Sequence, residues 1–432
     1  MAKLPDAAPS KAPTAMVVRR PLISANGDVA GFEFCVDRDV LKLMQKSADV
    51  HAQSACAATV LIAARLVAME GRIGFARLPA AWLVHVAVPK NESGTWIGLA
   101  SDAVLTSDMQ LAVVGVAQQF RAAGATLAWA PTLDLGTADF SPDFLLLEPT
   151  APTVGALLEN VRARAPALCH LPVILTGIAN LEDLELALQS GVSYASGGVA
   201  PSASPVSVAA ALDVPTIKGR GDAQPLPPEV SRVAQLLNQL SSGVDTDLIV
   251  SAIKGDIGLS FRLLQRMSSA SFAQLGAGAS IDQAVLMLGR NELQRWLSLM
   301  LMQFSGIRKA GSALQEIALW RSRLVELLAI EQGEAEPGQF FTLGLASMLG
   351  MLLNTPTAGV VKILSLPPLA AQALLAHTGP WHVYLRTAAL VEAQNVTEAQ
   401  AVADGFGGAV RVIELSDAAW AWAAANADRS KR

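Results

Sequence analysis

The stretch VAGFEFCV, Val29 to Val36, is a short apolar run, and a second such run follows at Ile73 to Leu78. Between them lies a longer segment with a helical pattern, Val50 to Glu70. Short apolar runs are typical of buried strands, whereas the intervening segment has the length of a helix. Strands and helices that take turns along the chain are typical of α/β domains, so this part of the sequence predicts an α/β fold.

The alternation of strand and helix patterns continues to about Val199. Further strands are predicted at Trp82–Val88, Leu127–Ala130, Phe144–Leu147 and Pro172–Leu175. Further helices are predicted at Ser107–Ala123, Val154–Ala165 and Leu181–Ser190.

Strand patterns nearly disappear in the second half, where apolar residues recur at helical spacing. Ser280 followed by Gln283 predicts a helix start, because the two side chains can cap each other's backbone amides. This half is therefore predicted to be all-α. Its predicted helices are Glu229–Leu240, Asp247–Ile253, Leu259–Ser268, Ile281–Leu288, Glu292–Met302, Leu314–Ile330, Gln339–Leu353, Thr357–Leu364, Leu369–Ala376, Trp381–Ala393, Glu398–Ala403 and Val410–Ala425.

The boundary between the two halves is predicted from composition. The segment 197–228 gathers Gly, Pro, Ser and Ala with little periodicity, and a chain of 432 residues is long enough for two domains. The N-terminus is rich in Pro and Ala and lacks the apolar run of a signal peptide. The predicted organisation is a disordered leader at 1–15, an α/β domain at 16–200, a linker at 201–225 and a helical domain at 226–432.

Composition argues against several classes of protein. Hydrophobic residues make up 52% of the chain, but the apolar stretches are short or interrupted, as Ala55–Met69 is by Arg65, so no membrane span is predicted. The net charge of -5 with no long basic run argues against direct nucleic-acid binding. The three cysteines form no CxxC pair, which is typical of a reducing compartment and favours a cytoplasmic protein.

Motifs of common enzymes are missing from the sequence. It contains no GxxxxGK phosphate loop, no GxSxG elbow and no complete GxGxxG. The five histidines show no HExxH or comparable ligand spacing. Neither a cofactor nor a metal is predicted.

Short motifs follow one another at the ends of the predicted strands. The first are RRPLI (Arg19–Ile23), NGD (Asn26–Asp28) and GFEF (Gly31–Phe34), and the last are GIANLEDL (Gly177–Leu184) and GVSY (Gly191–Tyr194). In their order they resemble the EAL phosphodiesterase family, especially its branch fused to HDOD domains: the first three resemble its opening strand, hairpin and EAL-bearing strand, and the last two resemble its last strand, helix and turn. The resemblance implies a (β/α)8-like barrel, whose active members hold two divalent cations at the carboxyl ends of the strands and hydrolyse cyclic di-GMP.

The resemblance also implies that this site is degenerate. Only Glu33 matches a metal ligand of the family, at the glutamate of the EAL signature. Asp134 offers an alternative register for one aspartate, which still leaves the pair incomplete. The other vestigial positions are His85 for an asparagine, Ala130 and Pro131 for the paired aspartates, Leu145–Glu148 for the catalytic lysine, Thr176 and Ala179 for glutamates, and Ser196 for a glutamine.

In the family, an arginine that follows the EAL signature binds a phosphate. The residue aligned with that arginine here is Asp37. An acidic residue there would repel a phosphate. The best remaining nucleotide contacts are Arg38, Arg19 and Arg20.

The second half contains the segments LPPE (Leu226–Glu229), DIGLSFRLL (Asp256–Leu264), SSASF (Ser268–Phe272) and IDQAVLMLGRNELQRW (Ile281–Trp296), the last of which has a glycine turn between two predicted helices. In this succession the segments resemble the HDOD domain. HDOD domains are similar to HD phosphohydrolases that have lost their ligands, and here Ser347 and Met348 take the His-Asp position.

The sequence therefore predicts a non-catalytic bacterial signalling scaffold, a pseudoenzyme that acts through contacts with other signalling proteins. The first alternative is a receptor that binds cyclic di-GMP without hydrolysis. A weak residual phosphodiesterase is the second alternative. Homo-oligomerisation is left open.

Overall fold

The computed structural model describes residues 17–47, 49–100, 105–131, 133, 141–148, 170–178, 180–199, 228–241, 243–256, 259–260, 262–263, 266, 280–302, 309–353, 356–364, 366–393 and 401–427. The chain forms two compact units. The first comprises Met1–Pro215 with Leu390–Ile413, and the second comprises Thr216–Ala389 with Glu414–Arg432. The predicted leader, the predicted linker and the predicted helix Val154–Ala165 lie outside the described residues.

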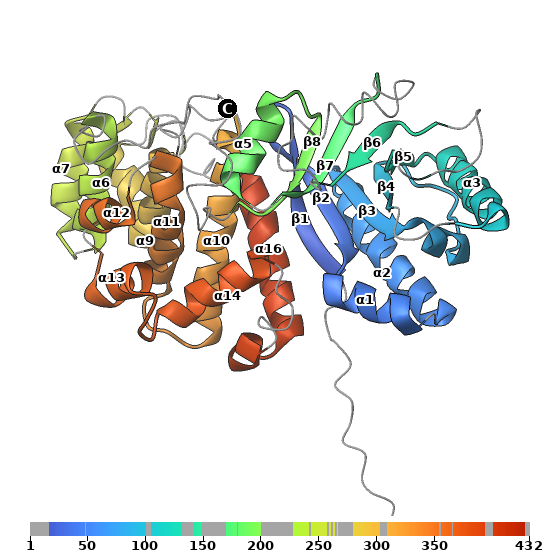
Figure 1. Ribbon diagram of the computed structural model, residues 1–432. Coiled ribbons are helices and arrows are strands. Elements are labelled where there is room, and N and C mark those ends of the chain that lie inside the picture. The colour runs from blue at the N-terminus through green and yellow to red at the C-terminus, as the bar shows by residue number, and fades with distance from the viewer. Residues whose placement is uncertain are drawn as a thin grey trace, which may run out of the picture. The chain divides into compact units, whose positions relative to one another are not determined.

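Eight strands close into a barrel in the first unit, and they follow one another around it in chain order (Figure 1). The first strand runs antiparallel to both of its neighbours, and all other neighbouring strands are parallel. This confirms the predicted α/β barrel. The strands are β1 (Val17–Ser24), β2 (Val29–Val36), β3 (Ile73–Pro79), β4 (Thr95–Ala100), β5 (Thr126–Trp129), β6 (Phe144–Leu147), β7 (Val173–Ile178) and β8 (Tyr194–Gly197).

Apolar side chains fill the middle of the barrel. Side chains alternate between the two faces of a strand, so every second residue points inward. The inward residues of five strands form one buried cluster: Leu22, Phe75, Ala128, Leu146 and Ile174. Gly98 on β4 leaves room for this cluster, since a Cβ atom there would lie 2.6 Å from the Phe75 ring. The rings of Trp96, Phe144 and Tyr194 pack beneath the cluster, with centroids 4.7 to 5.8 Å apart.

Helices α1 (Arg38–Ser47) and α2 (Val50–Met69) connect β2 to β3, and α3 (Ser107–Ala122) and α5 (Leu181–Gln189) follow later. The side chain of Asp49 caps α2 by accepting from the backbone amides of His51 and Ala52. Helix α2 packs one face against β2 and β3. By length and composition alone, α2 is the one helix in the described ranges that could cross a membrane, which is weak support because core helices meet the same criterion.

The prediction of a strand at Trp82–Val88 is wrong. The structure has a 3-10 helix there, η1 (Ala80–His85), and the next strand is β4, which the sequence pattern missed. The β-branched and aromatic residues of this segment favour a strand. However, Ala80, Trp82 and Leu83 are buried together at a turn-like spacing, and η1 packs against α2 and α3.

The second unit is helical, as predicted, and its helices run from yellow-green to red in Figure 1. Ser280 and Gln283 cap each other's amides, as expected, with bonds of 3.0 and 3.2 Å. The predicted segments Leu259–Ser268 and Glu398–Ala403 lie partly outside the described residues. The helices from Pro228 onward are α6 (Pro228–Ser241), α7 (Thr246–Lys254), α9 (Ile281–Met302), α10 (Gly311–Glu331), α11 (Pro337–Leu353), α12 (Thr357–Ile363), α13 (Pro368–Leu375), α14 (His382–Ala393) and α16 (Ala409–Ala427), of which α14 ends and α16 begins in the segment assigned to the first unit.

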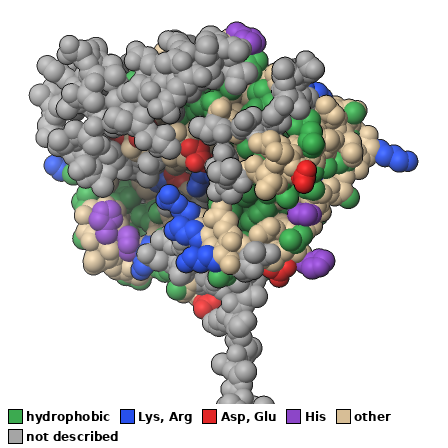
Figure 2. Space-filling view, turned by 45° about the vertical axis from the view of Figure 1, so that its right-hand side comes forward, with side chains coloured by type: hydrophobic (Ala, Val, Ile, Leu, Met, Phe, Trp, Pro, Cys, Tyr) green, Lys and Arg blue, Asp and Glu red, His purple; other side chains and the backbone are tan. Residues whose placement is uncertain are grey.

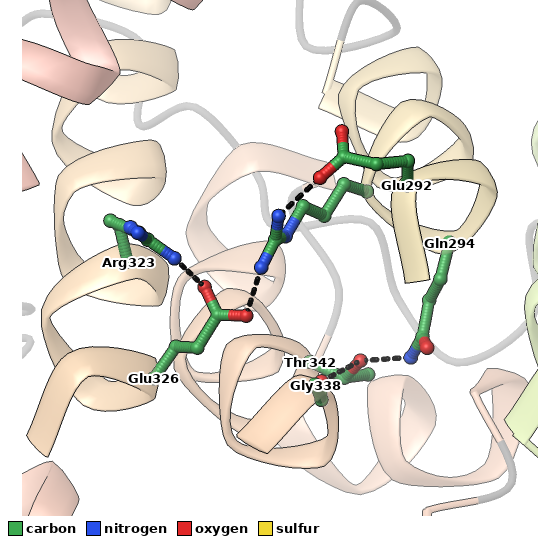
Figure 3. A network of polar contacts seen from close by, with 7 residues as sticks. Glu292, Gln294, Arg323, Glu326, Gly338 and Thr342 are labelled. Carbon is green, nitrogen blue, oxygen red and sulfur yellow. Dashed lines mark hydrogen bonds and ion pairs between the residues drawn. The ribbon is translucent and has the colours of Figure 1, made fainter. Parts of the chain in front are cut away.

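A buried ion-pair network joins helices in this unit (Figure 3). The side chain of Glu326 on α10 is 2% exposed and accepts hydrogen bonds from Arg295 of α9 and from Arg323. Each arginine also lies over an aromatic ring, Arg295 over Phe341 and Arg323 over Trp422, at 5.9 and 5.8 Å. The network therefore links α9 and α16 to α10.

Gly289 interrupts α9, which agrees with the predicted glycine turn. Its backbone has φ 68° and ψ 168°, a region that only glycine adopts without strain. The following residue, Arg290, donates to the carbonyls of Gln239 and Leu240 at the end of α6. The break therefore aims Arg290 at the neighbouring helix.

We expect Gly289→Ala to lower the free energy of unfolding of the second unit by about 2 kcal/mol. The reason is conformational, because a Cβ atom at this position would meet nothing within 4 Å. Gly115→Ala is the matched control, since Gly115 lies within α3 and also has open space around it; it should stabilise the chain by up to about 1 kcal/mol. Urea unfolding measures both, and a neutral Gly289→Ala would contradict the strained geometry.

Candidate functional site

The candidate site lies above the apolar cluster, toward the carboxyl ends of the parallel strands. Glu33 of β2 and Arg77 of β3 both point inward, because Phe75, two residues before Arg77, pairs with Glu33 in the sheet and belongs to the interior cluster. Thr176 and Ser196 reach the same layer from β7 and β8. Residues far apart in the sequence therefore meet around one carboxylate.

The Glu33 carboxylate is fully buried and both of its oxygens have partners. Arg77 Nε donates to Oε1 at 2.5 Å, and Ser196 Oγ donates to Oε2 at 2.5 Å. Arg20 Nη1 lies 4.0 Å from Oε2. The same Arg77 guanidinium also donates to the half-exposed carboxylate of Glu148, just beyond β6.

The charges around Glu33 keep it ionised. Burial alone would raise the pKa of Glu33, but the neighbouring charges of Arg77 and Arg20 and the hydrogen bond from Ser196 outweigh it and lower the pKa. Burial likewise opposes the charge on Arg77, yet Glu33, with a smaller contribution from Glu148, raises the pKa of Arg77. Glu33 and Arg77 thus form a charged pair inside the barrel.

The structure brings some of the predicted vestigial residues to Glu33 and not others. Ser196 contacts the carboxylate directly, and Thr176 is buried and donates to the carbonyl of Leu147. His85 is exposed on η1, whereas the β3 side chain that meets Glu33 is Arg77. Ala130 and Pro131 follow β5 and are half-buried, and Ala179 lies outside the described residues.

The three arginines proposed as nucleotide contacts lie in different places. Arg20 points into the barrel, near Glu33. Arg19 is the next residue on β1 and therefore faces outward, where its guanidinium stacks on the ring of Phe32 at 3.8 Å. Arg38 is exposed at the first position of α1. Of the three, Arg20 is the one placed at the carboxylate.

A pocket of about 320 Å³ lies beside the ends of β3 and β4. Among the described residues, its lining is mostly apolar, with two glutamine amides and no acidic or basic side chain. The lining residues are Gln45, Gln53, Pro79, Ala80, Ala81, Trp82, Ala100, Leu105 and Leu133.

The sequence patterns did not identify Arg77 as the partner of Glu33, nor Glu148 as a second partner of Arg77. Arg77 lies 44 residues from Glu33, so no local spacing connects the two. The signal that could have revealed Arg77 is its place in the run IGFARLP, where a cation occurs on the same face as Phe75 in an otherwise apolar strand. Period-2 alternation puts that cation inside the barrel.

Residues that could bind a metal do not gather in the part of the chain that the structure describes: no three His, Cys, Asp or Glu side chains come together there. Ser347 and Met348 lie on α11 in the second unit, where Met348 is fully buried. Ser347 Oγ donates to the Gly344 carbonyl at 2.6 Å and accepts from Arg321 Nη1 at 3.3 Å. The predicted HD position thus also faces an arginine.

This geometry defines a class of protein in which an eight-stranded α/β barrel and an all-helical unit belong to one chain. Residues 224–358 match the family model of the HDOD domain. That part of the chain is an HDOD domain, as predicted.

The chain is also similar to the uncharacterized protein YuxH of Bacillus subtilis (strain 168). The two are 29% identical over 166 residues, which is 37% of this chain and 40% of that protein. The match thus spans less than half of the relative.

Solved structures similar to the barrel are EAL domains. One is an EAL domain protein from Listeria monocytogenes EGD-e, with TM-score 0.30 and 14% identity, covering 42% of this chain and 86% of that one. Another is the FimX EAL domain from Pseudomonas aeruginosa bound to c-di-GMP, with TM-score 0.28 and 12% identity, covering 42% and 88%. TM-scores this low say nothing about the chemistry of this chain.

Proposed function

We propose that this protein is a non-catalytic bacterial signalling protein that works through contacts with other signalling proteins, and that its barrel is a vestigial cyclic di-GMP phosphodiesterase. The observation that carries the proposal is the Arg77 guanidinium bound to Glu33. A two-metal hydrolase needs several oxygen ligands that converge on its cations. Here the one acidic residue that matches the family's ligands is already neutralised.

Binding of a divalent cation at Glu33 would require Arg77 to leave a buried carboxylate. Breaking a buried ion pair is costly, and the positive guanidinium would also repel the incoming cation. The neighbouring inward groups, such as Thr176 and Ser196, are neutral hydroxyls, which are poor replacements for carboxylates. The residues that the structure describes around Glu33 do not fit two divalent cations, which supports the proposal that the barrel does not hydrolyse cyclic di-GMP.

The HDOD domain supports the signalling part of the proposal. The side chains at the predicted HD position are a hydroxyl and a thioether, and Arg321 lies against the hydroxyl. A buried Met348 offers no ligand for a hard divalent cation. The described residues of neither unit gather ligands for metal-dependent hydrolysis, and contact with other proteins is a function that fits both units.

A receptor for cyclic di-GMP is the second candidate, and the placement of Arg20 favours it. Arg20 and Arg77 are 27% and 17% exposed at the barrel mouth, so a phosphate could approach both guanidinium groups. Glu148, which is half-exposed and bound to Arg77, would have to move aside. Residual phosphodiesterase activity is the third candidate and lacks such an observation.

The test is a calorimetric titration of the full chain with cyclic di-GMP, with and without Mg²⁺ or Mn²⁺, and analysis of the same samples for linear product. We expect neither heat nor product, because Glu33 is neutralised by Arg77. An active EAL phosphodiesterase serves as the positive control.

Two outcomes would overturn this expectation in different ways. Metal-independent binding without product would favour the receptor, and Arg20→Met should then weaken it while Arg38→Met, at the exposed start of α1, should not. Metal-dependent product would show that catalytic ligands exist elsewhere, and the proposal of a vestigial site would be wrong.

A further inference from the structure

Helix α2 is apolar on two opposite faces. One face packs against the barrel through Cys56, Ala57, Val60, Leu61, Ala64 and Val67. On the other face, Ile62, Leu66 and Met69 are 53%, 59% and 83% exposed. A helix that covers a barrel usually turns a polar face outward, so the outer face of α2 has a composition suited to a partner.

The outer residues of α2 follow the spacing of a helix-pairing seam. Ala55, Thr59, Ile62, Leu66 and Met69 are all exposed and are separated by four, three, four and three residues. This alternation is the spacing by which two helices pack side by side. The Thr59 hydroxyl donates to the Ala55 carbonyl at 2.8 Å, so its hydrogen bond is made within the helix. We call these five residues the α2 stripe.

Exposure alone does not single out the α2 stripe. Hydrophobic side chains also reach the surface elsewhere on the molecule, as one face shows in Figure 2. Scattered exposed apolar residues are ordinary in proteins. An example is Leu111, which is 65% exposed and is the one large exposed hydrophobic residue of α3. The α2 stripe differs because its members continue over more than three helical turns.

We propose that the α2 stripe pairs antiparallel with the α2 stripe of a second copy of this chain, across a two-fold axis at Ile62. The stripe is self-complementary in size about that residue. Its C-terminal half carries the large side chains of Leu66 and Met69, and its N-terminal half carries the small ones of Thr59 and Ala55. In an antiparallel pair, position 69 of one copy meets position 55 of the other, so large side chains pack on small ones.

Charge also permits this pairing. Arg65 is the one charged residue within α2, and it is bound to Glu92, whose side chain is fully buried, so its charge is compensated within each copy. Antiparallel helices also place opposite ends of their dipoles together. A parallel pair would instead place Met69 against Met69 and the small residues against each other.

The expected dimer is weak. The α2 stripe extends from Ala55 to Met69, 14 helical rises or about 21 Å of helix, which is short compared with a standard interface. We therefore expect a dissociation constant on the order of 10 to 100 micromolar for the full chain.

Sedimentation equilibrium of the full chain over this concentration range tests the proposal. Ile62→Glu brings two carboxylates together at the axis, and it should raise the dissociation constant more than about tenfold. Leu111→Glu is the matched control, because it makes the same kind of change at an exposed leucine of α3. It should leave the dissociation constant unchanged, and circular dichroism should show that both variants keep the helix content.

Cysteine cross-linking tests the direction of the pairing. Ile62→Cys in a Cys169→Ser background should form an intermolecular disulfide on mild oxidation, since Cys35 and Cys56 are buried. Met69→Cys should not cross-link to itself, because the two copies of position 69 lie about 21 Å apart in the antiparallel pair. Met69→Cys mixed with Ala55→Cys should cross-link.

Several results would overturn the proposal. A chain that stays monomeric to several hundred micromolar, or an Ile62→Glu variant that dimerises like the wild type, would do so. Self-cross-linking of Met69→Cys would show a parallel pair. A monomer whose Ile62→Cys thiol reacts slowly would show that another part of the same chain covers the stripe, and Ile62-dependent sedimentation with phosphatidylglycerol vesicles would show a lipid-binding face.

Discussion

Replacing Arg77 with Met is expected to lower the free energy of unfolding of the barrel by about 3 kcal/mol or more. Met has a similar length but cannot neutralise Glu33, which is fully buried. After the change, Glu33 keeps Ser196 Oγ at 2.5 Å and the more distant Arg20 at 4.0 Å. An incompletely paired carboxylate inside a barrel either destabilises the fold or takes up a proton, so the pKa of Glu33 should rise in this variant.

The local measurement for Arg77→Met is hydrogen exchange of the amides in β2 and β3, combined with urea unfolding of the full chain. Glu148→Gln is the matched control, since it removes the half-exposed partner of the same guanidinium. It should cost less than about 1 kcal/mol. Adding Glu33→Gln to the Arg77→Met variant should recover part of the loss, because the second change removes the buried charge. Equal effects of Arg77→Met and Glu148→Gln would contradict the central role given to the Glu33 pair.

A loss of about 3 kcal/mol is also expected for Glu326→Gln in the second unit. The Glu326 carboxylate is 2% exposed and accepts from Arg295 and Arg323 on opposite oxygens (Figure 3). An amide has the same shape, but its NH₂ group is a donor and would face an arginine donor. Both guanidinium groups are about four-fifths buried and would lose their shared charge partner.

Glu292→Gln is the control for this prediction, because Glu292 also binds Arg295 but is 42% exposed. We expect a loss of less than about 1 kcal/mol from that change. Helix content followed by circular dichroism during urea unfolding measures both variants. A Glu326→Gln variant as stable as Glu292→Gln would mean that the network contributes little to the fold.

Most strands and helices could be predicted because their apolar residues recur at a fixed period. The runs at β2 and β6 and the break at Gly289 are found in the structure where the sequence indicated them. The strand β4 was missed because Gly98 interrupts its apolar pattern, and its glycine serves packing inside the barrel. The apolar run at Trp82–Val88 favours a strand locally, but burial against α2 and α3 selects a 3-10 helix.

The candidate site was predictable only in part. Glu33 and Ser196 could be named from the order of motifs, and the structure places them in contact. Whether their alignment with the family's catalytic positions is correct stays a prediction. The partnership of Glu33 with Arg77 depends on the closure of the barrel and on strand register, neither of which leaves a fixed spacing in the sequence.

The ion pair between Glu33 and Arg77 has a consequence for how the barrel responds to its surroundings. A metal ion held by carboxylates is in exchange with the free ion in the cell, so its occupancy follows the supply of magnesium or manganese and falls when a chelator is added. A guanidinium that belongs to the chain is a counter-ion that never dissociates from it. The Arg77 guanidinium therefore stays beside Glu33 at any metal concentration. We expect the charge inside the barrel to remain the same across changes in metal supply that would remove the ions from a metal-dependent barrel.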